Sequence, residues 1–183
     1  MNVKILVPIA QGSEELEAVT MIDLFRRANI KVTVAGENEI ITCSRGLKII
    51  PDVLLDTIDT DLHFDAIVLP GGAQGTENLK KHDILGKILD FQKSKNKMIA
   101  AICAAPTILD HFNILDKNTK ITSHPAVKDL LRKYKYLNDR VVIDGNIVTS
   151  RGAGTAIEFS LHIIRTLCGD DIADTVAEGI VYR

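Results

Sequence analysis

The chain lacks several features on which whole classes of proteins depend. Its 183 residues include 22 basic and 24 acidic side chains, so no positive excess is available for nucleic acid or for an anionic membrane surface. The three cysteines, Cys43, Cys103 and Cys168, are an odd number and form no Cys-x-x-Cys motif, unlike the disulfide framework of a small secreted domain. We therefore expect a reducing, cytoplasmic location and small neutral or acidic partners.

Long apolar segments and metal-binding motifs are also missing. The first apolar stretch, residues 3–10, is too short to span a bilayer, and no basic leader of a signal peptide precedes it. No H-x-x-x-H pattern or cluster of cysteines and histidines suggests a metal. The sequence thus predicts a protein with no membrane segment and no metal.

Short apolar runs alternate with segments of helical spacing. Four runs have the composition of buried strands: residues 3–9, 30–34, 65–69 and 97–102. Between them, residues 14–28 place Leu16, Val19, Ile22 and Phe25 at helical spacing, and the residues around Ile88 form a second amphipathic segment. Parallel strands need crossover connections, which helices supply, so we predict one α/β domain over residues 1–183, with a mostly parallel sheet covered by helices on both faces.

Two segments look like additions to this sheet. One covers residues 40–51, and the other covers residues 140–150, where Asp144-Gly145-Asn146 between apolar residues predicts a β-hairpin. A closing amphipathic helix follows and is predicted to end at Gly169.

Cys103 is the strongest candidate for chemistry. It directly follows the apolar run 97–102 and precedes a plausible helix start, so its thiol would lie on a strand-to-helix elbow. There the helix N-terminus and free backbone N–H groups could stabilise a thiolate or an oxyanion. Because cysteine is often simply buried, its position alone leaves a structural role equally open.

Other residues could share that edge of the sheet, although each also has an ordinary structural interpretation. Gly71-Gly72 ends another strand and could approach a ligand closely or form a turn. His124 follows an expected strand over residues 120–123. Glu14, Glu15 and Glu17 open a helix, where carboxylates are usually solvated and complement the helix dipole.

Taken together, these segments resemble one protein family. The motifs that carry the resemblance are Gly12–Glu17, Ile41–Gly46, Leu69–Gly72, Ala100–Pro106, His124–Pro125 and Thr149–Thr155. In order, and over nearly the whole chain, they are similar to those of the ThiJ/PfpI superfamily, in the branch of the parkinsonism-associated deglycase and its bacterial relatives. The resemblance implies a flavodoxin-like three-layer sandwich, a homodimer and no cofactor.

The resemblance also implies roles for single residues. Cys103 would be the nucleophile, Glu17 would donate a hydrogen bond from its protonated carboxyl to the thiolate, and His124 would lie beside the pair. A protonated carboxyl is physically reasonable there, because burial raises the pKa of a carboxyl. The backbone N–H groups of Gly72 and Ala104 would form the oxyanion site.

Two arginines and one neighbour of the cysteine complete this picture. By the same resemblance Arg45 would face the pocket and Arg27 would reach it from the partner subunit, both as anion-binding groups. Protease-like members of the superfamily place a histidine directly after the nucleophile; Ala104 stands there in this chain, so peptidase activity is not expected.

Two functions use the same residues. In the first, Cys103 adds to a small 2-oxoaldehyde such as methylglyoxal, or to its protein adducts, and a 2-hydroxy acid is released; this is glyoxalase or protein deglycase activity, which protects against carbonyl and oxidative stress. In the second, Cys103 is oxidised to a sulfinate and acts as a redox signal for chaperone-like binding. A scaffold with a vestigial site is a third, weaker alternative.

Overall fold

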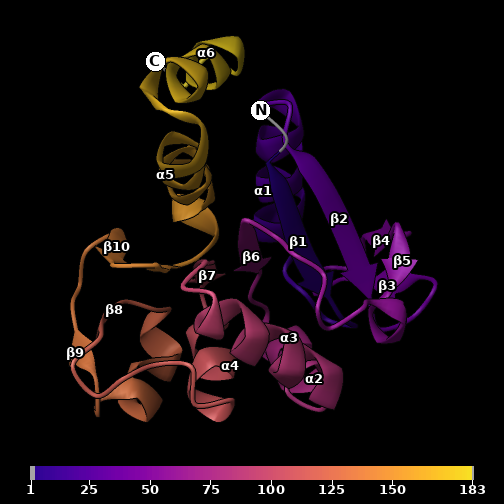
Figure 1. Cartoon of the computed structure of the whole chain (residues 1–183), viewed down its shortest axis with the longest axis vertical. Helices are drawn as coiled ribbons and strands as arrows, with labels where there is room; N and C mark the ends of the chain where they lie inside the picture. The colour runs from indigo at the N-terminus through magenta and orange to yellow at the C-terminus, as the bar shows by residue number, and fades with distance from the viewer. Residues whose placement is uncertain (1–2, 183) are drawn as a thin grey trace.

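Seven short strands form one twisted sheet in the computed structural model, which describes residues 3–182 (Figure 1). In sheet order they are β10 (Val141–Asp144), β11 (Ile147–Ser150), β7 (Met98–Ile102), β6 (Ala66–Leu69), β1 (Lys4–Ile9), β2 (Lys31–Gly36) and β5 (Val53–Leu54). Every pair is parallel except β10 and β11, which form an antiparallel hairpin at the edge. The predicted strands and the mostly parallel sheet are confirmed.

Helices cover both faces of the sheet. On one face lie α1 (Glu15–Arg27), α5 (Ala156–Cys168) and α6 (Asp170–Gly179); on the other lie α2 (Ala73–Leu79), α3 (Asp83–Ser94) and α4 (Pro106–His111). Because side chains alternate along a strand, Ile5 and Val7 of β1 join the first layer, while Leu6 joins the second. The apolar strands are therefore buried on both sides, and the flavodoxin-like three-layer sandwich is confirmed.

The smaller elements lie outside the main sheet. They are the hairpin of β3 (Ile41–Thr42) and β4 (Lys48–Ile49), the pair of β8 (Lys120–Ile121) and β9 (Lys135–Tyr136), and three 3₁₀ turns, η1 (Leu55–Thr57), η2 (Pro125–Leu131) and η3 (Ala153–Thr155). Segment 40–51 is thus an addition to the sheet, as predicted.

The second predicted addition belongs to the sheet itself. The hairpin over residues 140–150 forms, but β11 pairs in parallel with β7 and all four of its residues are buried. The physical reason is that β7 is buried, so the backbone N–H and C=O groups along its open edge need hydrogen-bond partners, which β11 supplies. Of the two hairpin strands, only β10 lies at the edge of the sheet.

Helix α1 forms where predicted, yet its buried face differs. Met21, Leu24 and Phe25 face the core, whereas Leu16 and Val19 are 57% and 45% exposed. The buried stripe continues through a carboxylate residue, Glu17, which is fully buried.

The carboxyl ends of the parallel strands meet at one edge of the sheet. There β6 leads into Gly71-Gly72, β7 into Cys103 and β11 into Gly152. This is the edge at which open α/β sheets bind ligands. Within residues 3–182, no helix is both long and apolar enough to cross a membrane.

Candidate active site

Cys103 lies on a strained backbone turn directly after β7. Its φ of 64° is in the left-handed region, which residues other than glycine seldom adopt. The turn is held from both sides, because the Cys103 N–H donates to the Ser150 carbonyl at 3.0 Å and the Cys103 carbonyl accepts from the His124 N–H at 2.8 Å. The predicted elbow is therefore present, and the half-buried thiol projects from it.

Glu17 reaches the thiol from α1. Its Oε2 accepts a hydrogen bond from the Gly71 N–H at 2.8 Å, while Oε1 is buried and has no hydrogen-bond partner. The approach is possible because residue 71 is glycine: a Cβ there would lie 2.5 Å from Cys103 Cβ and 2.8 Å from Glu17 Oε2. The solvated interpretation of this carboxylate is wrong, and the close pairing with Cys103 is the one that the resemblance implies.

Burial sets the protonation of the carboxyl. It raises the pKa of Glu17 to about 7, against the opposing effects of the Gly71 N–H and the Cys103 thiol. Burial also raises the pKa of Cys103, and together with an ionised Glu17 it brings that pKa to about 12, although the N–H groups of Gly72 and Ala104 oppose this. A proton kept on Glu17 removes the repelling charge, so the site can hold a thiolate only while the carboxyl is neutral.

His124 lies beside the thiol but not at the end of a sheet strand. It is the N-cap residue of η2, and its Nδ1 accepts a hydrogen bond from the Ala126 N–H at 3.2 Å. The neutral ring therefore carries its proton on Nε2. The expected strand is shorter than predicted, because β8 ends at Ile121, and His124 is held instead by its N–H bond to Cys103.

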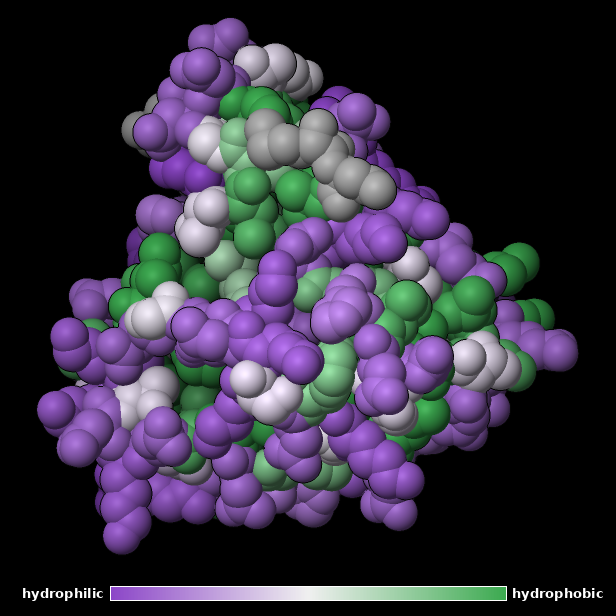
Figure 2. All heavy atoms as spheres, viewed as in Figure 1, coloured by the Kyte–Doolittle hydropathy of each residue, from purple (hydrophilic) through white to green (hydrophobic). Residues whose placement is uncertain are grey.

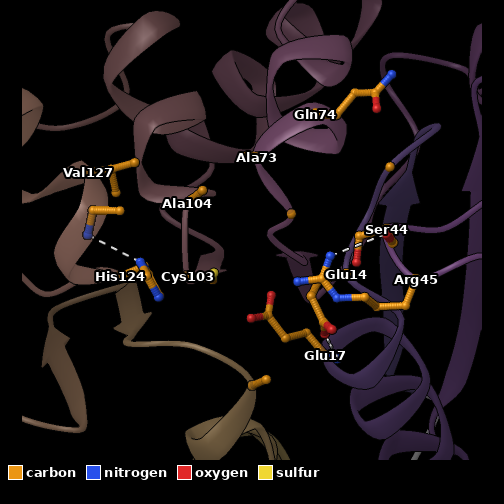
Figure 3. A pocket seen from close by; sticks show the side chains of 14 residues that line it. Glu14, Glu17, Ser44, Arg45, Ala73, Gln74, Cys103, Ala104, His124 and Val127 are labelled. Carbon is orange, nitrogen blue, oxygen red and sulfur yellow. Dashed lines mark hydrogen bonds between the residues drawn. The ribbon is translucent and has the colours of Figure 1, made fainter.

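A cavity of about 540 Å³ opens over these groups (Figure 3). Cys103 lies between a wall formed by the start of α1 and the β3–β4 hairpin and a wall formed by η2 and Ala104, just before α4. The lining residues are Gly12, Glu14, Glu17, Ser44, Arg45, Gly72, Ala73, Gln74, Cys103, Ala104, His124, Ala126, Val127 and Ala153.

The two predicted arginines have different positions. Arg45 lines the cavity, but Arg27 does not line it and instead forms an exposed 2.6 Å ion pair with Asp23 on its own helix. Within one chain, therefore, the structure brings together Cys103, Glu17, His124 and Arg45, and leaves Arg27 outside.

The other cysteines lie in different surroundings. Cys43 is buried, and burial together with Glu15 and Glu14 raises its pKa to about 11. Cys168 is at the end of α5, where burial raises its pKa. In residues 3–182 no group of three or more histidine, cysteine, aspartate or glutamate side chains could hold a metal ion.

Sequence reasoning overlooked several lining residues. Gln74 is on α2 and Val127 is on η2, neither of which was predicted, and nothing in the local sequence marks these two residues. Glu15 was interpreted as solvated with its neighbours, yet its carboxylate binds the β3–β4 turn.

Comparison with known proteins identifies the family of this chain. The model of the DJ-1/PfpI family matches residues 3–166. The chain belongs to the DJ-1/PfpI family. The family resemblance noted from the motifs is thereby confirmed, and it extends across the strands and loops that form the cavity.

Individual relatives cover almost the entire chain. Protein dj-1beta of Drosophila melanogaster is 43% identical over 185 residues, covering 99% of this chain and 98% of its own. Its crystal structure superposes with a TM-score of 0.94, with 99% and 98% of the two chains covered. A Caenorhabditis elegans relative named glutathione-independent glyoxalase DJR-1.2 is 38% identical, covering 91% of this chain and 89% of its own.

Proposed function

We propose that this protein is a cofactor-independent glyoxalase that converts small 2-oxoaldehydes such as methylglyoxal into 2-hydroxy acids. The observation that carries the proposal is the buried Glu17 carboxyl, with a pKa of about 7, beside the Cys103 thiol in an open cavity. A nucleophile and an acid–base group with a pKa near neutrality are what this chemistry requires. The C. elegans relative named as a glutathione-independent glyoxalase supports the same assignment.

The reaction begins with addition to the aldehyde. The Cys103 sulfur attacks the aldehyde carbon, the C=O bond opens, and the oxygen takes a proton, which gives a hemithioacetal. The N–H groups of Gly72 and Ala104, which point at the sulfur, are available to stabilise the developing oxyanion.

The next step moves a proton between the two substrate carbons. A base removes the hydrogen from the former aldehyde carbon to give an enediol, and protonation of the neighbouring carbon then gives a thioester. Glu17 and His124 are the acid–base groups of the cavity that can carry this proton. Water finally hydrolyses the thioester, so methylglyoxal and one water yield lactate and free Cys103.

The size and openness of the cavity bear on the substrate. About 540 Å³ is ample for a three-carbon aldehyde and leaves room for part of a longer side chain. The proposal therefore includes deglycase activity on methylglyoxal adducts of proteins, through the same attack by Cys103. Removal of these compounds would protect the cell against carbonyl and oxidative stress.

A second candidate is redox sensing. Of the three thiols, Cys103 is the one that lines the large cavity, and the N–H groups beside it could hold the oxygens of a sulfinate. A sensor would change state once and then alter chaperone-like binding, whereas an enzyme turns over repeatedly.

We also propose that the protein acts as a homodimer through the outer face of α1. Leu16, Val19 and Ile50 are 57%, 45% and 79% exposed, and Val19 and Ile50 line the same surface hollow, which a second copy of the chain could cover. Apolar side chains also protrude at the right edge in Figure 2, where Figure 1 places β4 and β5. Arg27 is on the same helix, so a partner packed there could direct it toward the neighbouring cavity.

The experiment that tests the enzymatic proposal is lactate formation from methylglyoxal by purified protein with all free thiols excluded. Many equivalents of lactate per chain are expected from the wild type and none above background from Cys103→Ala. Formation of one equivalent or less by the wild type would contradict turnover and favour the redox function.

A further inference from the structure

Glu15 begins α1 but does not behave as a solvated helix-terminal residue. Its Oε2 accepts a hydrogen bond from Ser44 Oγ at 2.7 Å, and its Oε1 accepts from the backbone N–H groups of Arg45 at 2.8 Å and Leu47 at 3.4 Å. Partial desolvation favours the neutral form, but these donors outweigh it and hold the pKa of Glu15 below its ordinary value. One carboxylate therefore ties the start of α1 to the turn between β3 and β4.

That turn carries the cation at the cavity wall. Arg45 lines the cavity on the same side as Glu14 and across from His124 (Figure 3). Within residues 3–182 its guanidinium makes no ion pair with a carboxylate, and its one hydrogen bond is a 3.4 Å contact with the Ser44 carbonyl. The two arginines of α1, by contrast, are each paired with an aspartate.

A cation without a carboxylate partner beside a nucleophile is suited to an anionic ligand. Its side chain is long and exposed, so its direction depends on where the backbone of the turn is held. Glu15 contributes a direct hydrogen bond to the backbone of Arg45 itself. It therefore acts on the cavity through another residue and does not line the cavity itself.

We propose that Glu15 is a positioning residue that fixes Arg45 over the cavity, so that the site prefers carbonyl ligands bearing a carboxylate close to the carbon that Cys103 attacks. As a statement about substrates this rests on the proposed function, but the charge preference of the cavity is a property of the folded protein. It can be measured without turnover.

Replacing Glu15 should change the anion preference of the cavity in opposite directions under positioning and under simple electrostatics. Removing the negative charge of Glu15 should, by charge alone, make the cavity more attractive to an anion. Loosening the turn should have the opposite effect, because the positive charge of Arg45 is then held less firmly over the cavity.

The measurement is the ratio of the rates at which Cys103 is alkylated by iodoacetate, which carries a carboxylate, and by neutral iodoacetamide. Mass spectrometry of the Cys103 peptide separates this thiol from Cys43 and Cys168. The same thiolate attacks both reagents, so changes in its pKa cancel in the ratio. Dividing by the ratio for free glutathione removes the intrinsic difference between the reagents.

The expected ratios follow from the geometry. Arg45→Gln should lower the ratio about three- to tenfold, the size expected for one charge near a protein surface. The ratio for Glu15→Ala should fall between those of the wild type and Arg45→Gln, because the bond from the Ser44 N–H to the Ser13 carbonyl still holds part of the turn. The double variant should be no lower than Arg45→Gln alone, because both changes act through the same interaction. Glu15→Gln loses the same charge but retains one acceptor oxygen, so its ratio should lie between those of the wild type and Glu15→Ala.

Controls separate positioning from loss of charge and from misfolding. Glu77→Gln removes an exposed carboxylate on α2 whose partner is Lys80 and not the β3–β4 turn, so it should leave the ratio unchanged. Thermal unfolding checks the stability of each variant. Ser44→Ala is the alternative if Glu15→Ala does not fold: it removes only one donor to Glu15, so it should lower the ratio slightly.

A ratio that rises or stays constant in Glu15→Ala or Ser44→Ala would overturn the positioning role. An unchanged ratio in Arg45→Gln would overturn the anion preference itself. A wild-type protein that forms no lactate but shows the expected ratios would disprove the glyoxalase proposal and leave this inference standing.

Discussion

The proton shared by Glu17 and Cys103 gives the sharpest test of how the site works. The perturbation is to replace Glu17 by Leu, which removes its hydrogen bond, and by Gln, which keeps a donor of similar size but cannot ionise. The Glu17 side chain is fully buried, so little solvent can compensate for either change.

The structure gives the magnitude. Burial raises the pKa of Glu17 from 4.5 to about 7, so ionising this carboxyl costs roughly 3 kcal/mol more here than in water. A charge on sulfur has a burial cost of its own, but it is offset by the N–H groups of Gly72 and Ala104 and by the hydrogen bond that a protonated Glu17 donates. We therefore expect the pair to carry its negative charge on Cys103 while Glu17 stays protonated and donates to it.

The assay is the alkylation rate of Cys103 by neutral iodoacetamide as a function of pH. In the wild type the rate should reach its plateau below pH ~8.5, the range of an ordinary thiol. In Glu17→Leu the midpoint should move upward by at least about one unit, or ~1.4 kcal/mol, because the donor is lost. Glu17→Gln should move it less, yet should abolish lactate formation, since an amide cannot relay a proton.

The opposite sign would refute the reasoning. If Glu17 is ionised in the resting protein, its charge raises the pKa of Cys103 to about 12, and Glu17→Leu would then move the midpoint downward. Unchanged behaviour in both assays would mean that Glu17 is a bystander and that His124 or water carries the proton.

Three further outcomes are expected. Limiting peroxide should add oxygen to Cys103 before the other two cysteines, as mass spectrometry would show; earlier oxidation of either one would contradict the assignment. Sedimentation should give about twice the 20.1 kDa chain mass, and Ile50→Glu should shift the protein toward monomer; a monomeric wild type would remove the dimer from the proposal. Gly71→Ala should destabilise the protein by about 1–3 kcal/mol, because its Cβ would lie 2.5 Å from Cys103 Cβ, whereas Gly154→Ala has open space and serves as the control; equal stability of the two variants in urea would contradict the packing.

The fold was largely predictable because its signals are local. Apolar runs of strand length mark β1, β2, β6 and β7, and an Asp-Gly-Asn turn marks the β10–β11 hairpin. The position of β11 inside the sheet was not predictable, because it depends on which edge of β7 remains open. That is a property of the assembled sheet and leaves no sign in residues 147–150 themselves.

The site was predictable only in part. The elbow at Cys103 follows from a strand that ends at a cysteine before Pro106, which can begin a helix. The environment of Glu17 does not follow from its neighbours, since three carboxylates in one helical turn look alike. Tertiary contacts separate them: Glu14 caps α1, Glu15 binds the β3–β4 turn and Glu17 enters the core.

Helix α1 shows why helical periodicity fails to predict burial at a functional surface. It buries a carboxyl, Glu17, and exposes two large apolar side chains, Leu16 and Val19, which is the reverse of a stable solitary arrangement. Each departure is costly by itself, and such conflicts between sequence and structure are expected at functional surfaces. In the proposed reaction the inner face supplies the acid–base group beside Cys103, and the proposed dimer would cover the outer face. The same helix would then contact both subunits and both proposed catalytic cavities. Substitutions on its outer face should therefore change the pH dependence of Cys103 alkylation, which depends on Glu17.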